Sequence, residues 1–120
     1  MVETYIRFFN KKGFLHKKKL NNRLNDDLDN SAYKLGVPII KYNSFTTPKS
    51  DHRSFIKFVK KTKTSIEVAY FHSSKDSKYI HSPRDTPEKC NPENLNGCLD
   101  ICHDTIRTID SSKRFLKEVR

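Results

Sequence analysis

The sequence predicts a single small α+β domain spanning residues 1–120, in which a short, mainly antiparallel sheet is flanked by three to four helices. Three observations predict this fold class. The chain has 120 residues, a common length for one domain, and no repeat or linker divides it. Some segments alternate apolar and polar residues with the period of a strand. Others repeat apolar residues at the spacing of a helix.

The first half of the chain predicts a strand, a helix and a second extended segment. The stretch VETYIRFF alternates with period two, and Gly13 offers a turn after it. In residues 16–35 leucines recur at helical spacing, and Gly36 followed by Pro38 ends the predicted helix. Residues 37–45, VPIIKYNSF, are predicted to be extended because β-branched residues follow the proline.

The middle of the chain predicts a short helix and a hairpin. Asp51 is placed to cap the helix. The apolar residues of that helix are expected to face the core while its lysines face water: Phe55, Ile56, Phe58 and Val59. The stretch TSIEVAYFHS alternates as a central strand, with KYIHS as its hairpin partner.

The C-terminal part predicts a long helix and a last short one. Asn91 is a natural cap, and Pro92 suits the first helical position. The helix is expected to continue through Ile109 and to pack one apolar stripe on the core: Leu95, Cys98, Leu99, Cys102, Ile106 and Ile109. After residue 112 a short helix is expected to follow.

The charge of the chain is high and unevenly distributed, with a formal net value of +10. Six basic residues against Glu3 give residues 1–19 a charge of +5, and five basic residues give residues 53–63 another +5. Such clusters attract phosphates or an acidic protein surface. The sequence has neither a signal-peptide core nor an apolar run of about 20 residues. We therefore expect a cytoplasmic protein that does not associate with membranes.

All three cysteines lie in the stretch CNPENLNGCLDICH, residues 90–103. Cys90, Cys98, Cys102 and His103 form a candidate zinc set, because cysteines at i and i+4 of a helix can share one ion. However, His103 points about 100° away from Cys102 around the helix, and paired CxxC motifs are absent. Free cysteine also behaves as a small apolar core residue. We expect buried thiols and no metal, with the zinc set as the alternative.

Catalytic motifs are weak. His72 and His81 each precede a serine, which superficially resembles the twin motifs of two-histidine phosphodiesterases, but here they lie close together across a predicted hairpin. Gly13, Gly36 and Gly97 are the only glycines, so no glycine-rich phosphate loop is present. We expect neither enzymatic activity nor a cofactor.

Binding is the function class that remains. The segregated charge, with an acidic helix beside basic patches, favours a large acidic protein partner. For the alternative, nucleic acid, cations and aromatic residues interleave near the N-terminus, although the same residues also fit aromatic core positions and a solvated lysine face. A protein partner would contact aromatic anchors with lysines at the rim. The candidate binding residues are Arg7, Phe9, Phe14, Lys17, Lys18, Lys19, Tyr42, Lys57, Lys60, Lys61 and Tyr79.

Two stretches, MVETYIRFFNKKGFLHKKKLNN and KYNSFTTPKSDHRSFIKF, together with the chain length, resemble small accessory proteins of temperate phages of Gram-positive bacteria. More narrowly, the chain is similar to phage inhibitors of a defence-associated sirtuin, a bacterial protein that depletes NAD during infection. The resemblance implies an anti-defence protein that binds this large bacterial defence protein in the host cytoplasm and blocks its activation. The alternative is a basic nucleic-acid-binding protein without catalytic activity.

Overall fold

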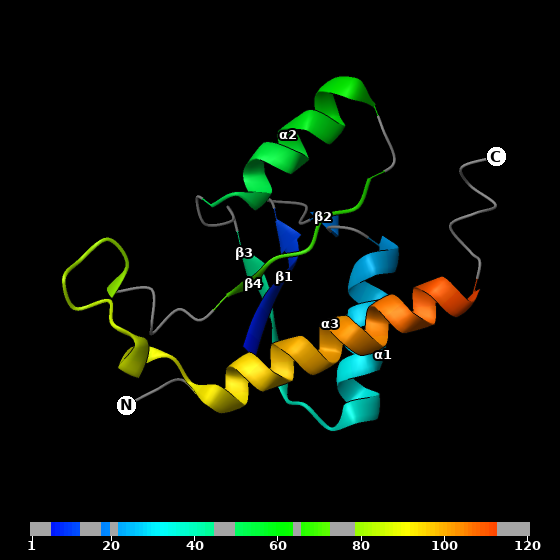
Figure 1. The fold of residues 1–120 in the computed structure, drawn as a ribbon. Helices are drawn as coiled ribbons and strands as arrows, with labels where there is room; N and C mark the ends of the chain where they lie inside the picture. Colours follow the sequence, from blue (N-terminus) through cyan, green and yellow to red (C-terminus); the bar gives the residue numbers. More distant parts are fainter. Residues whose placement is uncertain are drawn as a thin grey trace.

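The computed structural model describes residues 6–12, 18–19, 22–44, 50–63, 66–72 and 79–112. The elements in chain order are β1 (Ile6–Lys12), β2 (Lys18–Lys19), α1 (Asn22–Leu35), β3 (Ile39–Ser44), α2 (His52–Thr62), β4 (Phe71–His72), the 3-10 helix η2 (Pro87–Lys89) and α3 (Pro92–Ser112). Figure 1 shows α1 and α3 together at one end of the strands, with α2 at the other end.

Helices hold most of the regular structure in the described ranges. Helices α1, α2 and α3 have 14, 11 and 21 residues, whereas β1 and β3 have 7 and 6, and β2 and β4 have 2 each. The prediction of an α+β domain built on a mainly antiparallel sheet is therefore wrong. The longest strand pair, β1 with β3, is parallel. Sequence periodicity can locate a strand, but it does not reveal the partner or direction of that strand.

The strands all pair with β1. Strand β3 lies on one edge of β1, from Ile6 opposite Ile39 to Lys12 opposite Ser44, with an irregularity between Phe9 and Lys11. The other edge is shared by β2, which pairs near the end of β1, and by β4, which pairs near its start; both are antiparallel. A parallel pair needs a long crossover, and the segment containing α1 supplies it between β1 and β3.

The core lies where α1 crosses α3. Leu28, Ala32 and Ile101 are buried, and Leu24 and Phe71 pack against them from the edge. A buried hydrogen bond from Thr105 Oγ1 to Ser31 Oγ, 2.9 Å long, joins the two helices beside this cluster. The predicted helical leucines therefore do face the core at Leu28, whereas Leu35 is exposed.

Both ends of α1 have a clear physical cause. At the C-terminal end Gly36 adopts a left-handed φ of 69°, and the Val37 N–H donates to the Ala32 carbonyl oxygen at 3.0 Å. At the N-terminal end the cap comes from a distant segment, because Glu67 Oε1 accepts hydrogen bonds from the backbone N–H groups of Arg23 at 3.0 Å and Leu24 at 3.2 Å. The helix begins at Asn22, later than the predicted residue 16.

Helix α3 begins as predicted but buries a different face. Asn91 Oδ1 accepts from the backbone N–H groups of Glu93 at 2.9 Å and Asn94 at 3.4 Å, and Pro92 occupies the first helical position. The buried side of α3 is formed by Gly97, Ile101 and Thr105. The predicted core stripe is therefore wrong: Leu95, Leu99 and Ile106 are exposed, and Cys98, Cys102 and Ile109 are half-buried.

Helix α2 also differs from its prediction. Asp51 has helical dihedral angles and makes no side-chain cap hydrogen bond, so the predicted cap is absent. Phe55 and Phe58 are exposed rather than inward-facing, while Ile56 and Val59 are half-buried. The buried residue of this helix is His52 at its start.

The predicted hairpin is not formed as expected. Among the described residues of the stretch TSIEVAYFHS, 66–72, Phe71–His72 form a strand, and residues 66–70 belong to neither a helix nor a strand. Its predicted partner lies partly outside the described residues; Tyr79 has a 3-10 conformation, and Ile80 and His81 lie in a turn. The predicted helix after residue 112 also lies outside the described residues. In the part of the chain that is described, no helix combines the length and apolarity that crossing a membrane requires.

Candidate functional site

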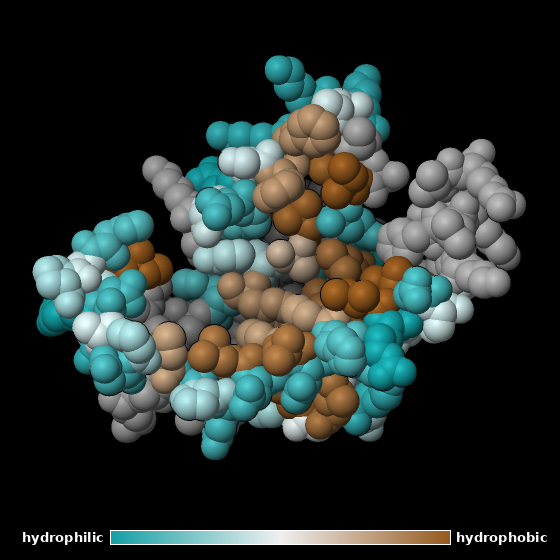
Figure 2. All heavy atoms as spheres, in the orientation of Figure 1, coloured by the Kyte–Doolittle hydropathy of each residue, from teal (hydrophilic) through white to brown (hydrophobic). Residues whose placement is uncertain are grey.

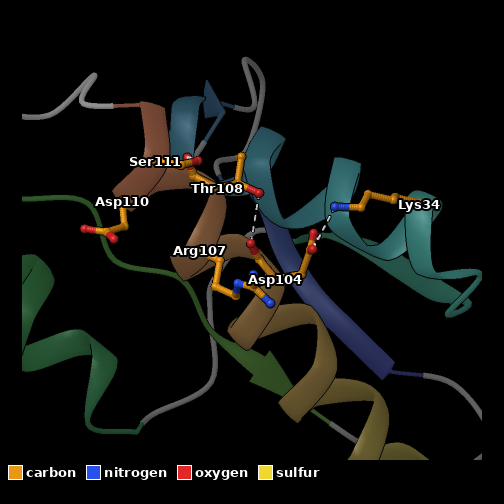
Figure 3. A pocket seen from close by; sticks show the side chains of 6 residues that line it. All are labelled: Lys34, Asp104, Arg107, Thr108, Asp110 and Ser111. Atoms are coloured by element: carbon orange, nitrogen blue, oxygen red, sulfur yellow. Dashed lines mark hydrogen bonds and ion pairs between the residues drawn. The ribbon is translucent and has the colours of Figure 1, made fainter.

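A polar pocket lies where the last turn of α1 meets the C-terminal half of α3. Its volume is about 460 Å³, and it is lined by Lys34, Asp104, Arg107, Thr108, Asp110 and Ser111. Figure 3 shows Lys34 reaching across from α1, whereas the other five side chains come from consecutive turns of α3. The pocket is formed by the same crossing of α1 and α3 that contains the core.

An ion pair holds the two helices together at the pocket. Lys34 Nζ donates to Asp104 Oδ1 at 2.8 Å, and the Asp104 side chain is 20% exposed. This hydrogen bond from Lys34, followed by one from Ser31 and by the charges of Lys34 and Arg107, holds the pKa of Asp104 below its usual value. Asp104 therefore stays ionised at neutral pH.

The other lining residues make hydrogen bonds within α3 or are exposed to solvent. Thr108 Oγ1 donates to the Asp104 carbonyl oxygen at 2.9 Å, and Ser111 Oγ donates to the Thr108 carbonyl oxygen at 3.1 Å. Arg107 and Asp110 are exposed and extend the pocket with one charge of each sign. A guanidinium binds a carboxylate through two parallel hydrogen bonds, and a carboxylate binds an ammonium group.

This arrangement suits binding better than proton transfer. An efficient general base has a pKa near the working pH, and the lowered pKa of Asp104 makes it a weak base at neutral pH. Among the described residues that line the pocket there is no histidine. The described pocket can hold a small molecule that carries both a carboxylate and an ammonium group.

Three stacked rings connect the start of α2 to β4 and to the residue before it. The rings of His52 and Tyr70 stack with centroids 4.0 Å apart, and those of Tyr70 and His72 stack at 5.9 Å. His52 is buried, so its ring serves packing at the start of α2 and is not accessible to a substrate. His81, which was paired with His72 in the sequence, lies in a turn with a left-handed φ of 61°.

The candidate zinc set is not brought together. Cys90 is exposed before α3, Cys98 and Cys102 are half-buried within α3, and His103 is exposed beside them. Over the described ranges, no three or more His, Cys, Asp or Glu side chains form a group that could hold a metal ion. Burial raises the pKa of the Cys98 and Cys102 thiols, and the charge of Cys102 adds to the shift at Cys98.

The predicted binding residues are scattered over the fold. Phe14 and Lys17 lie outside the described residues. Arg7 and Phe9 belong to β1, Lys18 and Lys19 form β2, and Tyr42 belongs to β3. Lys57, Lys60 and Lys61 are exposed on α2. Tyr79 is half-buried, and Lys89 Nζ lies 4.7 Å from the centroid of its ring. Their role in binding stays a prediction.

The sequence interpretation missed the pocket. Lys34 and Asp104 are 70 residues apart, and neither belongs to a motif. Both lie on the polar side of a predicted helix, where charged residues usually face solvent. Only the crossing of α1 over α3 brings them together, and sequence periodicity does not give the crossing.

In the comparison with protein families, the model of peptidase family M28 matches residues 5–106. This range covers most of the chain, from β1 to the second half of α3. Comparisons with curated proteins and with solved structures found no significant match.

The family match corrects the functional predictions. The resemblance to phage inhibitors of a defence-associated sirtuin is wrong, since the match is to a family of peptidases. The anti-defence function, the nucleic-acid-binding alternative and the prediction that the protein is not an enzyme are overturned by the same finding. Clustered charge and aromatic residues misled the interpretation, because a peptidase-related chain can carry the same composition.

Proposed function

The chain belongs to peptidase family M28, and we propose from this membership that its function is peptidase-related: it binds peptides and serves peptide-bond hydrolysis. The single observation that carries the proposal is the family match over residues 5–106. The matched range contains Lys34 and Asp104, the ion pair that joins α1 to α3 at the pocket. The other four lining residues follow the end of the match at residue 106: Arg107, Thr108, Asp110 and Ser111.

The role proposed for the pocket is to hold the charged end of a peptide. Arg107 is exposed, and its guanidinium can donate two parallel hydrogen bonds to the terminal carboxylate. Asp110 offers a negative charge for an ammonium group, and the hydroxyl groups of Thr108 and Ser111 can contact peptide amides. Lys34 and Asp104 satisfy each other and fix the shape of the pocket.

The experiment uses the full chain and short peptides that differ only at their ends. One peptide is free at both ends, a second is N-acetylated, and a third is C-amidated. Binding is measured by calorimetry, and hydrolysis is followed by mass spectrometry of the products. We expect saturable binding that weakens when the carboxyl end is amidated, because the contact with Arg107 is then lost.

A matched pair of variants locates the contact. Arg107→Ala removes a charged hydrogen-bonding group, typically worth about 1.5 to 3 kcal/mol, and should weaken binding of the free peptide roughly tenfold or more. Arg84→Ala removes another exposed arginine, in the turn before η2, and should change nothing. The proposal is wrong if the chain neither binds nor cleaves any of the three peptides.

A further inference from the structure

One face of the molecule exposes large apolar side chains over three separate segments. Figure 2 shows them gathering over α2, over the extended residues that follow it and over α3. The exposed large apolar residues on these segments are Phe55, Phe58, Ile66, Leu95, Leu99 and Ile106, each 53% to 65% exposed. We call this set the apolar face.

The apolar face reaches the upper end of what a monomer usually exposes in one patch. Six such side chains at roughly 100 Å² each expose roughly 600 Å², at the upper end of the largest patch of a typical monomer. That area also approaches the roughly 800 Å² that each partner contributes to a standard protein interface. Only Leu28, Ala32 and Ile101 form the buried apolar core of the described residues.

The α3 part of the face has the pattern of a packing surface. Leu95, Leu99 and Ile106, with half-buried Cys102 between them, recur at spacings of four, three and four, which places them along one side of the helix. The opposite side already packs on α1 through Ile101 and Thr105. Helix α3 therefore has two apolar sides, and the fold covers one of them.

The two helices of the face carry opposite charge. Helix α2 contains Arg53, Lys57, Lys60 and Lys61 and no acidic residue, which gives +4. Helix α3 contains Glu93, Asp100, Asp104 and Asp110 against Arg107, which gives −3. A surface that is basic and aromatic at one end and acidic and aliphatic at the other fits a partner with the same two halves in reverse order.

We propose that the occupant of the apolar face is a second copy of this chain, docked so that α2 of each copy packs on α3 of the other. A two-fold axis reverses the order of the halves, so both contacts form at once and the assembly closes as a dimer. Phe55 and Phe58 then bury against Leu99 and Ile106, and the lysines of α2 meet Asp100 and Asp110. An anionic lipid surface would attract α2 but would be repelled by α3.

The test measures molar mass by light scattering and sedimentation over a concentration series. The full chain should sediment at twice its 14.1 kDa mass in the micromolar range. Leu99→Glu places a charge in the contact and should yield a monomer with unchanged circular dichroism, since Leu99 is exposed in the single chain. Asp85→Lys, a charge reversal outside both helices, should leave the dimer intact.

A charge exchange gives the sharper test. One variant carries Lys57→Glu, Lys60→Glu and Lys61→Glu, and the other carries Asp100→Lys and Asp110→Lys. Each alone should be monomeric, because like charges face each other in its homodimer. Mixed in equal amounts, the two should form a heterodimer, in which both α2 to α3 contacts pair opposite charges.

Two results would overturn the proposal. The first is a wild-type chain that stays monomeric at concentrations far above about 1 µM, a dissociation constant that corresponds to roughly −8 kcal/mol. Co-sedimentation of that monomer with phosphatidylserine vesicles, abolished by the α2 variant, would identify lipid as the occupant instead. The second is a dimer that both charge variants leave intact, because the contact would then lie elsewhere.

Discussion

The three cysteines lie in two different environments. Cys90 is exposed before α3, whereas Cys98 and Cys102 are half-buried and burial raises the pKa of both thiols. Because the thiolate is the reactive form, a raised pKa lowers the reactive fraction at neutral pH. We therefore expect iodoacetamide to label Cys90 first in the native protein. Peptide mapping by mass spectrometry measures this order, and equal labelling rates at all three sites would contradict it.

The carboxylate of Asp104 makes the stability of the protein depend on pH. Its hydrogen bond from Lys34 lowers the pKa of Asp104 in the folded state below the unfolded value of about 3.9. The stabilisation is therefore present above that value and is lost as pH falls through the folded-state pKa. Asp104→Asn should lower the melting temperature at pH 7, and the difference from wild type should shrink as the pH falls through the folded-state pKa of Asp104.

The control for this titration is Asp85→Asn, which removes an exposed carboxylate outside the pocket. Thermal unfolding followed by circular dichroism at several pH values provides the measurement. If Asp104→Asn changes the melting temperature by the same amount at pH 2 as at pH 7, the ion pair with Lys34 does not stabilise the fold.

At the scale of single elements, α1 depends on a cap supplied by another segment. The Glu67 carboxylate accepts two backbone hydrogen bonds at the N-terminus of the helix, where a negative charge also favours the helix dipole. We expect Glu67→Ala to cost about 0.5 to 2 kcal/mol, the range measured for helix caps. Urea unfolding provides the measurement, with Asp85→Ala as the exposed control. Equal stabilities of the two variants would contradict this role for Glu67.

The crossing of α1 and α3 should be the most sensitive packing contact. Leu28 is 4% exposed at its centre, so Leu28→Ala should reduce the free energy of unfolding by about 2 to 5 kcal/mol. Tyr33→Ala on the same helix changes a side chain that is 90% exposed and serves as the control. A loss at Leu28 no greater than at Tyr33 would mean that the core lies elsewhere.

Local signals in the sequence predicted the ends of the helices better than the faces that the helices bury. Asn91 with Pro92, and Gly36 with Pro38, identify helix ends because each acts on its own neighbouring backbone. The buried face of α3 was missed because the helix is apolar on two sides, and the stronger stripe at Leu99 is the exposed one. The Glu67 cap has no local signal, since its partners lie more than 40 residues away.

At the scale of the whole molecule, the function depends on information that a single sequence does not make visible. The net charge of +10 pointed to acidic partners, whereas the family match points to peptides. No sequence motif marks the polar pocket, because Lys34 and Arg107 come to line the same pocket only when α1 crosses α3. Part of the positive charge lies on α2, whereas α3 carries a net negative charge. In the proposed dimer these opposite charges face each other.

The central claim is that this member of a peptidase family binds the charged end of a peptide in the pocket between α1 and α3. The most direct measurement is a titration of the isotope-labelled chain with a short free peptide, followed by backbone amide chemical shifts. We predict saturable shifts at Lys34 and across residues 104–111, and their loss in Arg107→Ala. An absence of shifts, or shifts confined to the amides of His52, Tyr70 and His72, which do not line the pocket, would contradict the claim.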